Sequence, residues 1–370
     1  MSKAAELAKW GEVSTNGQVS GRRNIVINGA MNVAQRSASE TGLGASAGYF
    51  TLDRFRISPT STAGRLTMEQ VAVTDLSGFA NCLKFTTTTA DTSIASGEKL
   101  ILQTKFEGQD LQQLQKGTST ANKFTLSFYV KGNAAAIYSV EIKDTDNNRS
   151  NTQSFAVTTS WNRIELTFAG DTTGVLDDDN AESISVNIWL HGGSDFTSGT
   201  YASNTWATTT NANRYAVASR TSIFDSTDRT FFITGLQMEV GSVATPFEHR
   251  SFGEELALCQ RYYWHTYSYG SPAGTTFNQD YEAPIIIIGT GNHGMGVCNG
   301  VYPVEMRAVP TISFYGSDGT ANRIRYWNSG SLAAYGTVNR STRQILGMSF
   351  NAGTDPEDFY SAALVCDAEL

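Results

Sequence analysis

The chain has 370 residues, of which 40% are hydrophobic and only 17% are charged, and its formal net charge is −8. This hydrophobic fraction supports a packed core and excludes global disorder. The excess of acidic residues argues against a nucleic-acid partner, because binding to a phosphate backbone requires clustered Lys and Arg. No apolar run reaches the roughly 18 residues of a membrane span, so no membrane insertion is expected.

The first 22 residues are predicted to be a short helix followed by a linker. Small and apolar residues share one face of residues 2–10 at helical spacing. An isolated helix of this length is marginal in water, so it either frays or docks on another surface. Residues 11–22 are rich in Gly, Ser and polar residues and have no periodicity, which is typical of a linker. The candidates for an anchoring or oligomer contact are Ala4, Leu7, Ala8 and Trp10.

Residues 23–250 have an almost entirely β pattern. Short segments such as 124–130 (FTLSFYV) and 183–190 (SISVNIWL) alternate apolar and polar residues with the period of two that half-buried strands show. Turn sequences rich in Asp, Asn and Gly separate these segments. Many short strands without long helices between them predict an all-β, antiparallel jelly-roll sandwich.

A helical pattern returns near residues 252–263, with Ser251 as the expected N-cap. We expect residues 251–264 to form a short connecting helix. Strand patterns then resume, and residues 265–370 are numerous enough for a second, smaller C-terminal β domain.

Cysteine and acidic residues give no firm metal site. The four cysteines are too far apart for a zinc motif and too sparse for a disulfide scaffold, which favours free thiols, although a Cys298–Cys366 bridge stays open. Residues 144–155 begin like a calcium loop, but Arg149 stands where Gly is required and Phe155 where Glu is required. We therefore expect no cofactor, and a structural calcium ion is left as an unsupported alternative.

No pattern predicts catalysis. Glu107 and Asp110 lie three residues apart, but glycoside cleavage needs two carboxyl groups on either side of a sugar, and a surface turn explains these residues better. Glu248 and His249 have no accompanying nucleophile motif such as GxSxG. The sequence therefore favours a protein that is not an enzyme.

Several stretches resemble bacteriophage tail-fibre and virion-associated fibre proteins. These are residues 24–37 (NIVINGAMNVAQRS), 48–57 (GYFTLDRFRI), 104–132, 235–264 and the terminal DAEL at 367–370. The middle of the chain also resembles a carbohydrate-binding-module jelly roll, in the succession FTLSFYVKG, VTTSWNRIELTFAG and TFFITGLQMEVG. Many such modules end with an Asp-rich strand that helps to hold calcium, whereas this chain has Gln237 and Glu239 there.

The resemblance implies a virion protein that is made in the host cytoplasm and acts at the host cell surface. It implies a homotrimer attached to the phage tail or other virion proteins through its N-terminus. The jelly roll and a distal C-terminal tip would then recognise a host-surface receptor, a glycan or a protein. Two alternatives stay open: a capsid or neck decoration or connector fibre without a receptor role, and a polysaccharide-depolymerising tailspike.

Aromatic residues are the best candidates for receptor contacts, because sugar rings bind with their C–H faces on exposed Trp or Tyr beside polar groups. One cluster lies in the loop-rich stretch 189–206, where Trp189 could equally belong to the core because it ends a strand. A second cluster lies in the C-terminal domain. The candidates are Trp189, His191, Tyr201, Trp206, Tyr267, Tyr269, Tyr326 and Trp327.

Overall fold

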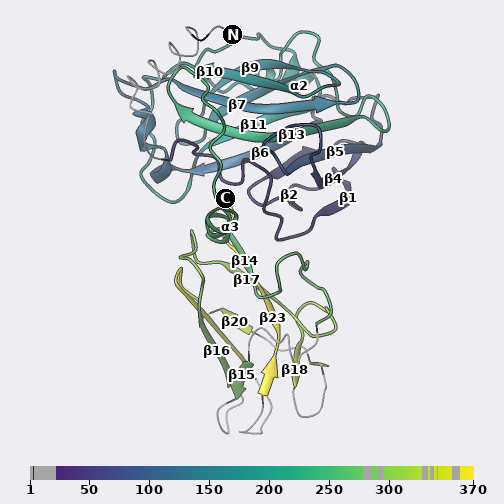
Figure 1. The fold of residues 1–370 in the computed structure, drawn as a ribbon, viewed down its shortest axis with the longest axis vertical. Helices are drawn as coiled ribbons and strands as arrows, with labels where there is room; N and C mark the ends of the chain where they lie inside the picture. The colour runs from purple at the N-terminus through teal and green to yellow at the C-terminus, as the bar shows by residue number, and fades with distance from the viewer. Residues whose placement is uncertain are drawn as a thin grey trace. The chain divides into compact units, whose positions relative to one another are not determined.

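The computed structural model places the chain in two compact units (Figure 1). The N-terminal unit comprises Met1–Asn32 and Ala38–Ser251, and the C-terminal unit comprises Val33–Ser37 and Phe252–Leu370. The structure describes Lys3 and residues 22–277, 286–289, 295–326, 332–333, 337–339, 341–351 and 359–370. The candidate anchoring residues Ala4, Leu7, Ala8 and Trp10 lie outside the described residues, so the N-terminal helix stays a prediction.

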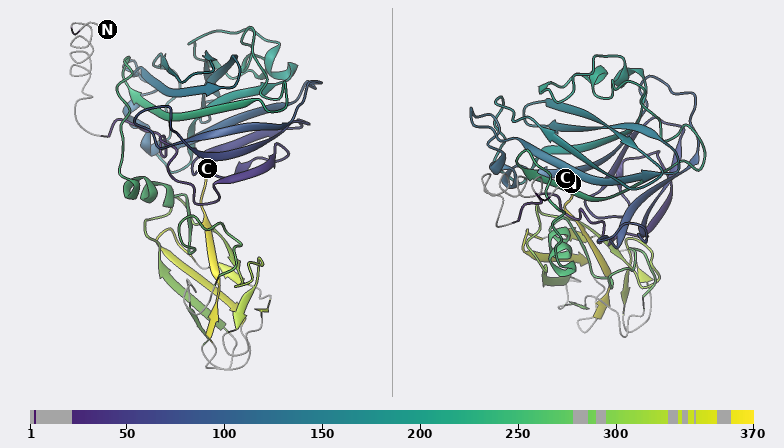
Figure 2. Two further views of the ribbon diagram at one scale, coloured as in Figure 1. Left: turned by 45° about the vertical axis from the view of Figure 1, so that its right-hand side comes forward. Right: turned by 45° about the horizontal axis from the view of Figure 1, so that its top comes forward.

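The N-terminal unit is a sandwich of two antiparallel sheets, and Figure 2 gives two further views of its strands. The first sheet has, in spatial order, β1 (Ser39–Leu43), β4 (Arg65–Ala72), β5 (Asn81–Thr89), β13 (Thr230–Val240), β7 (Phe124–Gly132) and β10 (Asn162–Phe168). The second has β12 (Ala207–Thr208), β9 (Arg149–Val157), β8 (Ala136–Asp144), β11 (Glu182–Gly192), β6 (Lys99–Glu107), β3 (Arg56–Thr60) and β2 (Gly48–Tyr49).

The strand order is that of a jelly roll. Eight strands form two four-stranded sheets, β5-β13-β7-β10 and β9-β8-β11-β6, and the chain crosses between them after nearly every strand. The remaining strands only extend the edges of these sheets. Two sheets with Greek-key connections define the jelly-roll arrangement. The predicted antiparallel β architecture is therefore confirmed for this unit.

Strand β11 differs from the predicted half-buried pattern, because Ser183–Leu190 are buried on both faces. The apolar residues of one face are Ile184, Val186, Ile188 and Leu190. On the other face lie Ser185, Asn187 and Trp189, which are covered by residues 194–221, a segment with helices α2 (Ser194–Thr197) and η3 (Asn211–Asn213). Phe196 and Tyr215 of this segment pack against Trp189. The outer face of the second sheet is thus a second packed layer.

A β-bulge changes the direction of the last residues of β11. Trp189 pairs with Ile101, but His191 pairs with Leu100, so Leu190 is an extra residue opposite a single step of β6. The extra residue turns the His191 side chain into the space between the sheets, where its ring packs edge-on against Phe224 at 5.3 Å. Bulges commonly redirect one side chain in this way.

Two short 3-10 helices, η1 (Gly108–Asp110) and η2 (Gln112–Leu114), follow β6 and bury Leu111 and Leu114. Glu107 is fully buried and its carboxylate accepts a hydrogen bond from Gln109 Nε2 at 2.6 Å. The predicted surface turn therefore holds for Asp110, which is exposed, but not for Glu107, which is the buried last residue of β6. Among the described residues, no helix combines the length and the apolar character that crossing a membrane requires.

The C-terminal unit contains α3 (Phe252–Gln260) and two antiparallel sheets. The smaller sheet has β14 (Tyr263–His265), β23 (Ala363–Asp367) and β17 (Thr311–Tyr315). The larger has β19 (Leu332–Ala333), β18 (Ile324–Tyr326), β22 (Phe359–Ser361), β15 (Ile286–Gly289), β16 (Met295–Val301), β21 (Ile345–Asn351) and β20 (Thr337–Asn339). The predicted helix over 252–263 therefore ends three residues early, because Tyr263 already pairs with Asp367 in a sheet.

The core of this unit lies around β17 and β23. Its buried residues are Tyr302, Met306, Phe314, Leu346, Ala362, Leu364, Cys366 and Ala368, with Trp264 and Ile312 packed against them. Cys82, Cys259 and Cys366 are buried, whereas the Cys298 side chain lies outside the described part of the structure, so the Cys298–Cys366 bridge stays untested.

Residues 33–37 belong to the C-terminal unit although they precede it by more than 200 positions. Gln35 Nε2 donates to the Tyr263 carbonyl at 2.8 Å, and the Gln35 carbonyl accepts from His265 Nε2 at 3.0 Å. The Arg36 guanidinium lies 3.7 Å from the centre of the Tyr263 ring and forms an ion pair with Glu369 at 3.3 Å. Part of the NIVINGAMNVAQRS stretch thus completes the second unit.

The preceding residues of that stretch lie along β13. The Asn24 side chain accepts hydrogen bonds from Val26 N and Met238 N, and Leu236 N donates to the Gly29 carbonyl at 2.9 Å. A Cβ atom on Gly29 would lie only 2.1 Å from the Leu236 carbonyl oxygen. Glycine is therefore required here by the close approach of two backbones.

We expect Gly29→Ala to lower the free energy of unfolding by ~1–3 kcal/mol, because the backbone of β13 must shift to admit the methyl group. Urea denaturation monitored by tryptophan fluorescence measures the change. Gly97→Ala is the control, since the nearest atom to its Cβ would be Asp195 Oδ2 at 3.6 Å. Equal losses in the two variants would contradict the steric explanation.

Candidate functional site

The structure corrects two of the predicted receptor residues. Trp189 is fully buried, its ring stacks on Tyr215 with 5.7 Å between centroids, and its Nε1 donates to Glu141 Oε2 at 3.0 Å. His191 is also fully buried, and the bulge turns it toward the inside of the sandwich. Neither side chain presents a face to a saccharide. The core alternative that the sequence left open for Trp189 is the one the structure adopts.

Glu141 is the centre of the polar network that holds the covering segment on the sheet. Arg214 donates to both carboxylate oxygens, from Nε to Oε1 and from Nη2 to Oε2, each at 2.8 Å. Asn187 Nδ2 donates to Oε2 at 3.1 Å. Burial favours the neutral acid, but Arg214 and the other donors outweigh it and lower the pKa of Glu141. The carboxylate is therefore ionised and fully paired.

The other two candidates of this cluster are half-buried, and their segment runs along β9. The Tyr201 hydroxyl accepts from Ser154 N of β9 at 2.9 Å. Trp206 Nε1 donates to the Ala169 carbonyl at 2.7 Å, and Lys116 Nζ lies 5.5 Å from its ring centre. The structure thus gives no common site for the predicted cluster of residues 189–206.

The second predicted cluster is brought together in part. Tyr267 and Tyr269 line one pocket of ≈ 370 Å³ in the C-terminal unit, which is within the size range of small-ligand sites. Its lining residues are Gln35, Leu256, Gln260, Trp264, His265, Thr266, Tyr267 and Tyr269. The Tyr326 side chain and Trp327 lie outside what the structure describes, so their place stays a prediction.

The tyrosine rings of this pocket are held in place by backbone donors. The Tyr269 hydroxyl accepts from Ala34 N at 3.1 Å, and its ring, which is 46% exposed, packs edge-on against Phe252 at 5.2 Å. The Tyr267 hydroxyl accepts from Gly274 N at 3.2 Å, and burial raises its pKa. Fixed rings lose little conformational freedom when a ligand binds, so they suit a binding site.

Two polar groups of the pocket are available to a ligand. Among the described residues, neither the Gln260 amide nor Trp264 Nε1 has a hydrogen-bond partner. His265 is a neutral donor to Gln35, since burial lowers its pKa. Three aromatic side chains beside unpaired amide and indole donors can accept a flat apolar face together with hydroxyl groups.

Sequence reasoning missed three of these residues. Trp264 follows a helical pattern and was expected in the connecting helix, but it lies in β14. Gln260 is the last residue of α3, and no motif in the sequence singles it out. Gln35 is separated from the pocket by more than 200 residues, and only the three-dimensional structure brings it there.

The carboxylates considered for the unsupported calcium alternative have partners within the protein. Glu239 accepts from Thr245 N at 2.9 Å, from Thr245 Oγ1 at 2.7 Å and from Gln237 Nε2 at 2.8 Å. In the loop that begins like a calcium site, Asp144 accepts from Asn147 N and forms an ion pair with Lys116 Nζ at 2.5 Å. Neutral donors and a lysine therefore stabilise these carboxylates.

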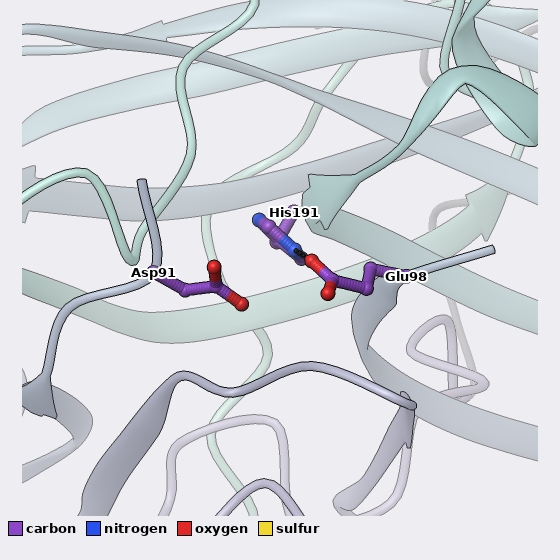
Figure 3. A group of neighbouring side chains, drawn as sticks. All are labelled: Asp91, Glu98 and His191. Atoms are coloured by element: carbon purple, nitrogen blue, oxygen red, sulfur yellow. Dashed lines mark hydrogen bonds and ion pairs between the residues drawn. The ribbon is translucent and has the colours of Figure 1, made fainter. Parts of the chain in front are cut away.

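One group of described residues does have the chemistry of metal ligands: Asp91, Glu98 and His191. Figure 3 shows the two carboxyl groups and the imidazole directed toward one another. One ligand atom from each residue lies within 4.8 Å of the others.

No family model matches the chain, and no curated protein matches it in sequence. Among solved structures, a CBM4 protein matches 58% of this chain and 98% of its own length, at 12% identity and a TM-score of 0.30. The enzymatically active domain of tailspike protein 4 of bacteriophage CBA120 matches 59% of this chain and 21% of its own, at 11% identity and a TM-score of 0.29. The family 11 carbohydrate-binding module of the Clostridium thermocellum cellulase Lic26A-Cel5E matches 54% and 99%, at 13% identity and a TM-score of 0.28. TM-scores of 0.30 and below assign neither a family nor a function to this chain.

We expect Arg214→Met to lower the free energy of unfolding by ~3–5 kcal/mol, because it leaves the Glu141 carboxylate buried without its cation. Adding Glu141→Gln to this variant should recover part of the loss. The control is Lys84→Met, which removes a half-buried pair with Glu69 at 3.3 Å and should cost less than about 1 kcal/mol. Chemical denaturation measures all three, and a small effect of Arg214→Met alone would refute the proposed pairing.

Proposed function

We propose that this protein is a structural protein of a bacteriophage tail fibre that binds a host cell-surface glycan. The observation that carries the proposal is the pocket in the C-terminal unit, where Trp264, Tyr267 and Tyr269 lie beside the amide of Gln260, which has no hydrogen-bond partner among the described residues. The resemblance of residues 24–37 and 235–264 to phage fibre proteins supports the virion assignment.

In this proposal the two units have different tasks. The jelly roll is a rigid spacer, and residues 1–22 attach the chain to the tail and to the other copies of a homotrimer. The pocket binds one sugar residue, with its C–H face on an aromatic ring and its hydroxyl groups on Gln260 and Trp264. A single site of this kind binds weakly, and several copies on one particle raise the effective concentration of the second and later contacts. The protein carries out no reaction on the glycan.

The direct test is competition for adsorption. Purified full-length protein should reduce phage adsorption to host cells, and it should leave host polysaccharide at its original chain length. Shortened polysaccharide would contradict the proposal and support the tailspike alternative. Unchanged adsorption, together with a capsid or neck location in a particle reconstruction, would contradict it in favour of a decoration or connector fibre.

We expect Gln260→Ala and Tyr269→Ala each to weaken binding to immobilised host polysaccharide by about 3- to 10-fold, since a net hydrogen bond or a ring contact contributes about 0.5–1.5 kcal/mol. The melting temperature should be unchanged for Gln260→Ala, whose side chain has no partner to lose among the described residues. Gln344→Ala is the matched control, because Gln344 is exposed in the same unit and bonds Glu305 outside the pocket. Surface plasmon resonance compares the three variants with the unaltered chain, and equal binding by all four proteins would exclude the pocket.

A further inference from the structure

The cluster of Asp91, Glu98 and His191 lies inside the N-terminal unit, at the connection between two strands (Figure 3). Asp91 follows the end of β5, Glu98 immediately precedes β6, and His191 lies near the end of β11. The three residues are at most 5% exposed, whereas residues 92–96 of the connecting loop are exposed. The cluster is therefore enclosed, but only a surface loop separates it from solvent.

The imidazole of His191 is directed into the cluster by two features. The bulge in β11 turns the side chain to the inner face of the sheet. Ser222 Oγ lies 2.8 Å from His191 Nδ1, and Ser222 Oγ is itself held by a hydrogen bond from Phe224 N at 3.0 Å. With Nδ1 occupied, Nε2 faces the two carboxyl groups. Histidine ligands of metal ions typically have their other ring nitrogen fixed by a partner of this kind.

The separation of His191 Nε2 and Glu98 Oε2 is close to that of two ligands of one metal ion. His191 Nε2 lies 3.4 Å from Glu98 Oε2, which is long for a hydrogen bond, where about 2.9 Å is usual. Two ligands of one tetrahedral zinc ion, each at about 2.0–2.1 Å, lie about 3.3 Å apart. The Asp91 carboxylate is within 4.8 Å of both ligand atoms, so a small movement of one side chain completes a three-ligand set.

Asp91 is held as an ionised carboxylate. Its Oδ2 accepts from Thr62 Oγ1 at 2.9 Å, from Ala63 N at 2.9 Å and from Gly64 N at 3.3 Å. Burial acts against the charge, but these donors outweigh it and lower the pKa of Asp91. All three donors contact Oδ2, and the Asp91 side chain also shares a hydrogen bond with Glu98.

The cluster lacks a cation of its own. Among the described residues, neither Asp91 nor Glu98 forms an ion pair with a lysine or an arginine. The third member, His191, is fully buried and directs Nε2 toward the Glu98 carboxylate, 3.4 Å away. Two enclosed carboxyl groups next to an imidazole, with no lysine or arginine beside them, are stabilised by a shared proton or by a metal ion.

We propose that Asp91, Glu98 and His191 form a binding site for one divalent transition-metal ion, and that Zn²⁺ is its preferred ion. One imidazole and two carboxylates are a mixed nitrogen and oxygen set, which suits Zn²⁺ better than Ca²⁺ or Mg²⁺, whose ligands are oxygen atoms. Water would fill the fourth position. The ion would link the β5–β6 connection to β11 and so stabilise this end of the sandwich. It would have no part in glycan binding.

The test uses the full-length protein after removal of metals with a chelator and dialysis. Zn²⁺ at about 100 times its dissociation constant should raise the melting temperature of the sandwich by about 5 °C or more, because an ion that binds only the folded state stabilises it. Glu98→Gln should abolish this shift. The variant is expected to fold, because it keeps the size and hydrogen bonding of the side chain and removes one enclosed acid. Glu69→Gln, on β4 and away from the cluster, should respond to Zn²⁺ as the unaltered chain does.

A second readout reports the ligands themselves. Co²⁺ added in place of Zn²⁺ should give visible absorption bands stronger than those of hydrated Co²⁺, and Glu98→Gln should remove them. The proposal is overturned by a wild-type melting temperature that does not respond to Zn²⁺, by an equal response of the wild type and Glu98→Gln, or by an equal response to Mg²⁺ or Ca²⁺. The first of these results would assign the cluster to a shared proton.

Discussion

The N-terminal unit depends on the insertion of β13 between β5 and β7. The N-terminal half of β13 pairs with β5, and most of the strand pairs with β7, across a register shift between Thr234 and Gln237. β5 and β7 do not pair with each other, and they are joined only through β13, which begins at Thr230. The segment that begins at Asn24 forms hydrogen bonds with Leu236 and Met238 of β13. The sandwich is thus completed by contacts between the first and last segments of the unit. Contacts between residues so far apart in sequence form slowly during folding.

The outer face of the second sheet is the other determinant of this fold. In a simple sandwich that face is solvated, and its residues alternate with the core. Here residues 194–221 cover it, and the charge of Glu141 beneath them is neutralised by Arg214. An enclosed ion pair of this type stabilises less than an apolar contact of the same size, but it fixes one arrangement of the segment on the sheet. The covering segment buries Trp189, so this residue cannot contact a ligand. The candidate binding site is therefore the pocket of the C-terminal unit.

Sequence reasoning predicted the antiparallel strands because alternation depends only on local periodicity. The segments at 124–130 and 183–190 are both strands. Alternation shows which residues share a face, but it does not show what covers that face, and so the sequence leaves both a receptor site and the core open for Trp189. His191 was misplaced for a different reason, since a single inserted residue reverses the direction of every side chain after it. Gln35 could not have been found, because no local signal links residues 33–37 to a pocket formed after residue 252. The trimer and the N-terminal anchor stay predictions.

The location of residues 33–37 limits how the chain can be divided. A break at Ser251 would leave the C-terminal unit without Gln35 and Arg36, and with them the partners of Tyr263, His265 and Glu369. A break after Ser37 would separate the first residues of the sandwich from β13. No single junction therefore yields two complete halves. Exchange of the C-terminal unit between related chains would require two simultaneous crossovers, or a five-residue segment that every interchangeable partner accepts, so the C-terminal unit and the start of the chain would be inherited together.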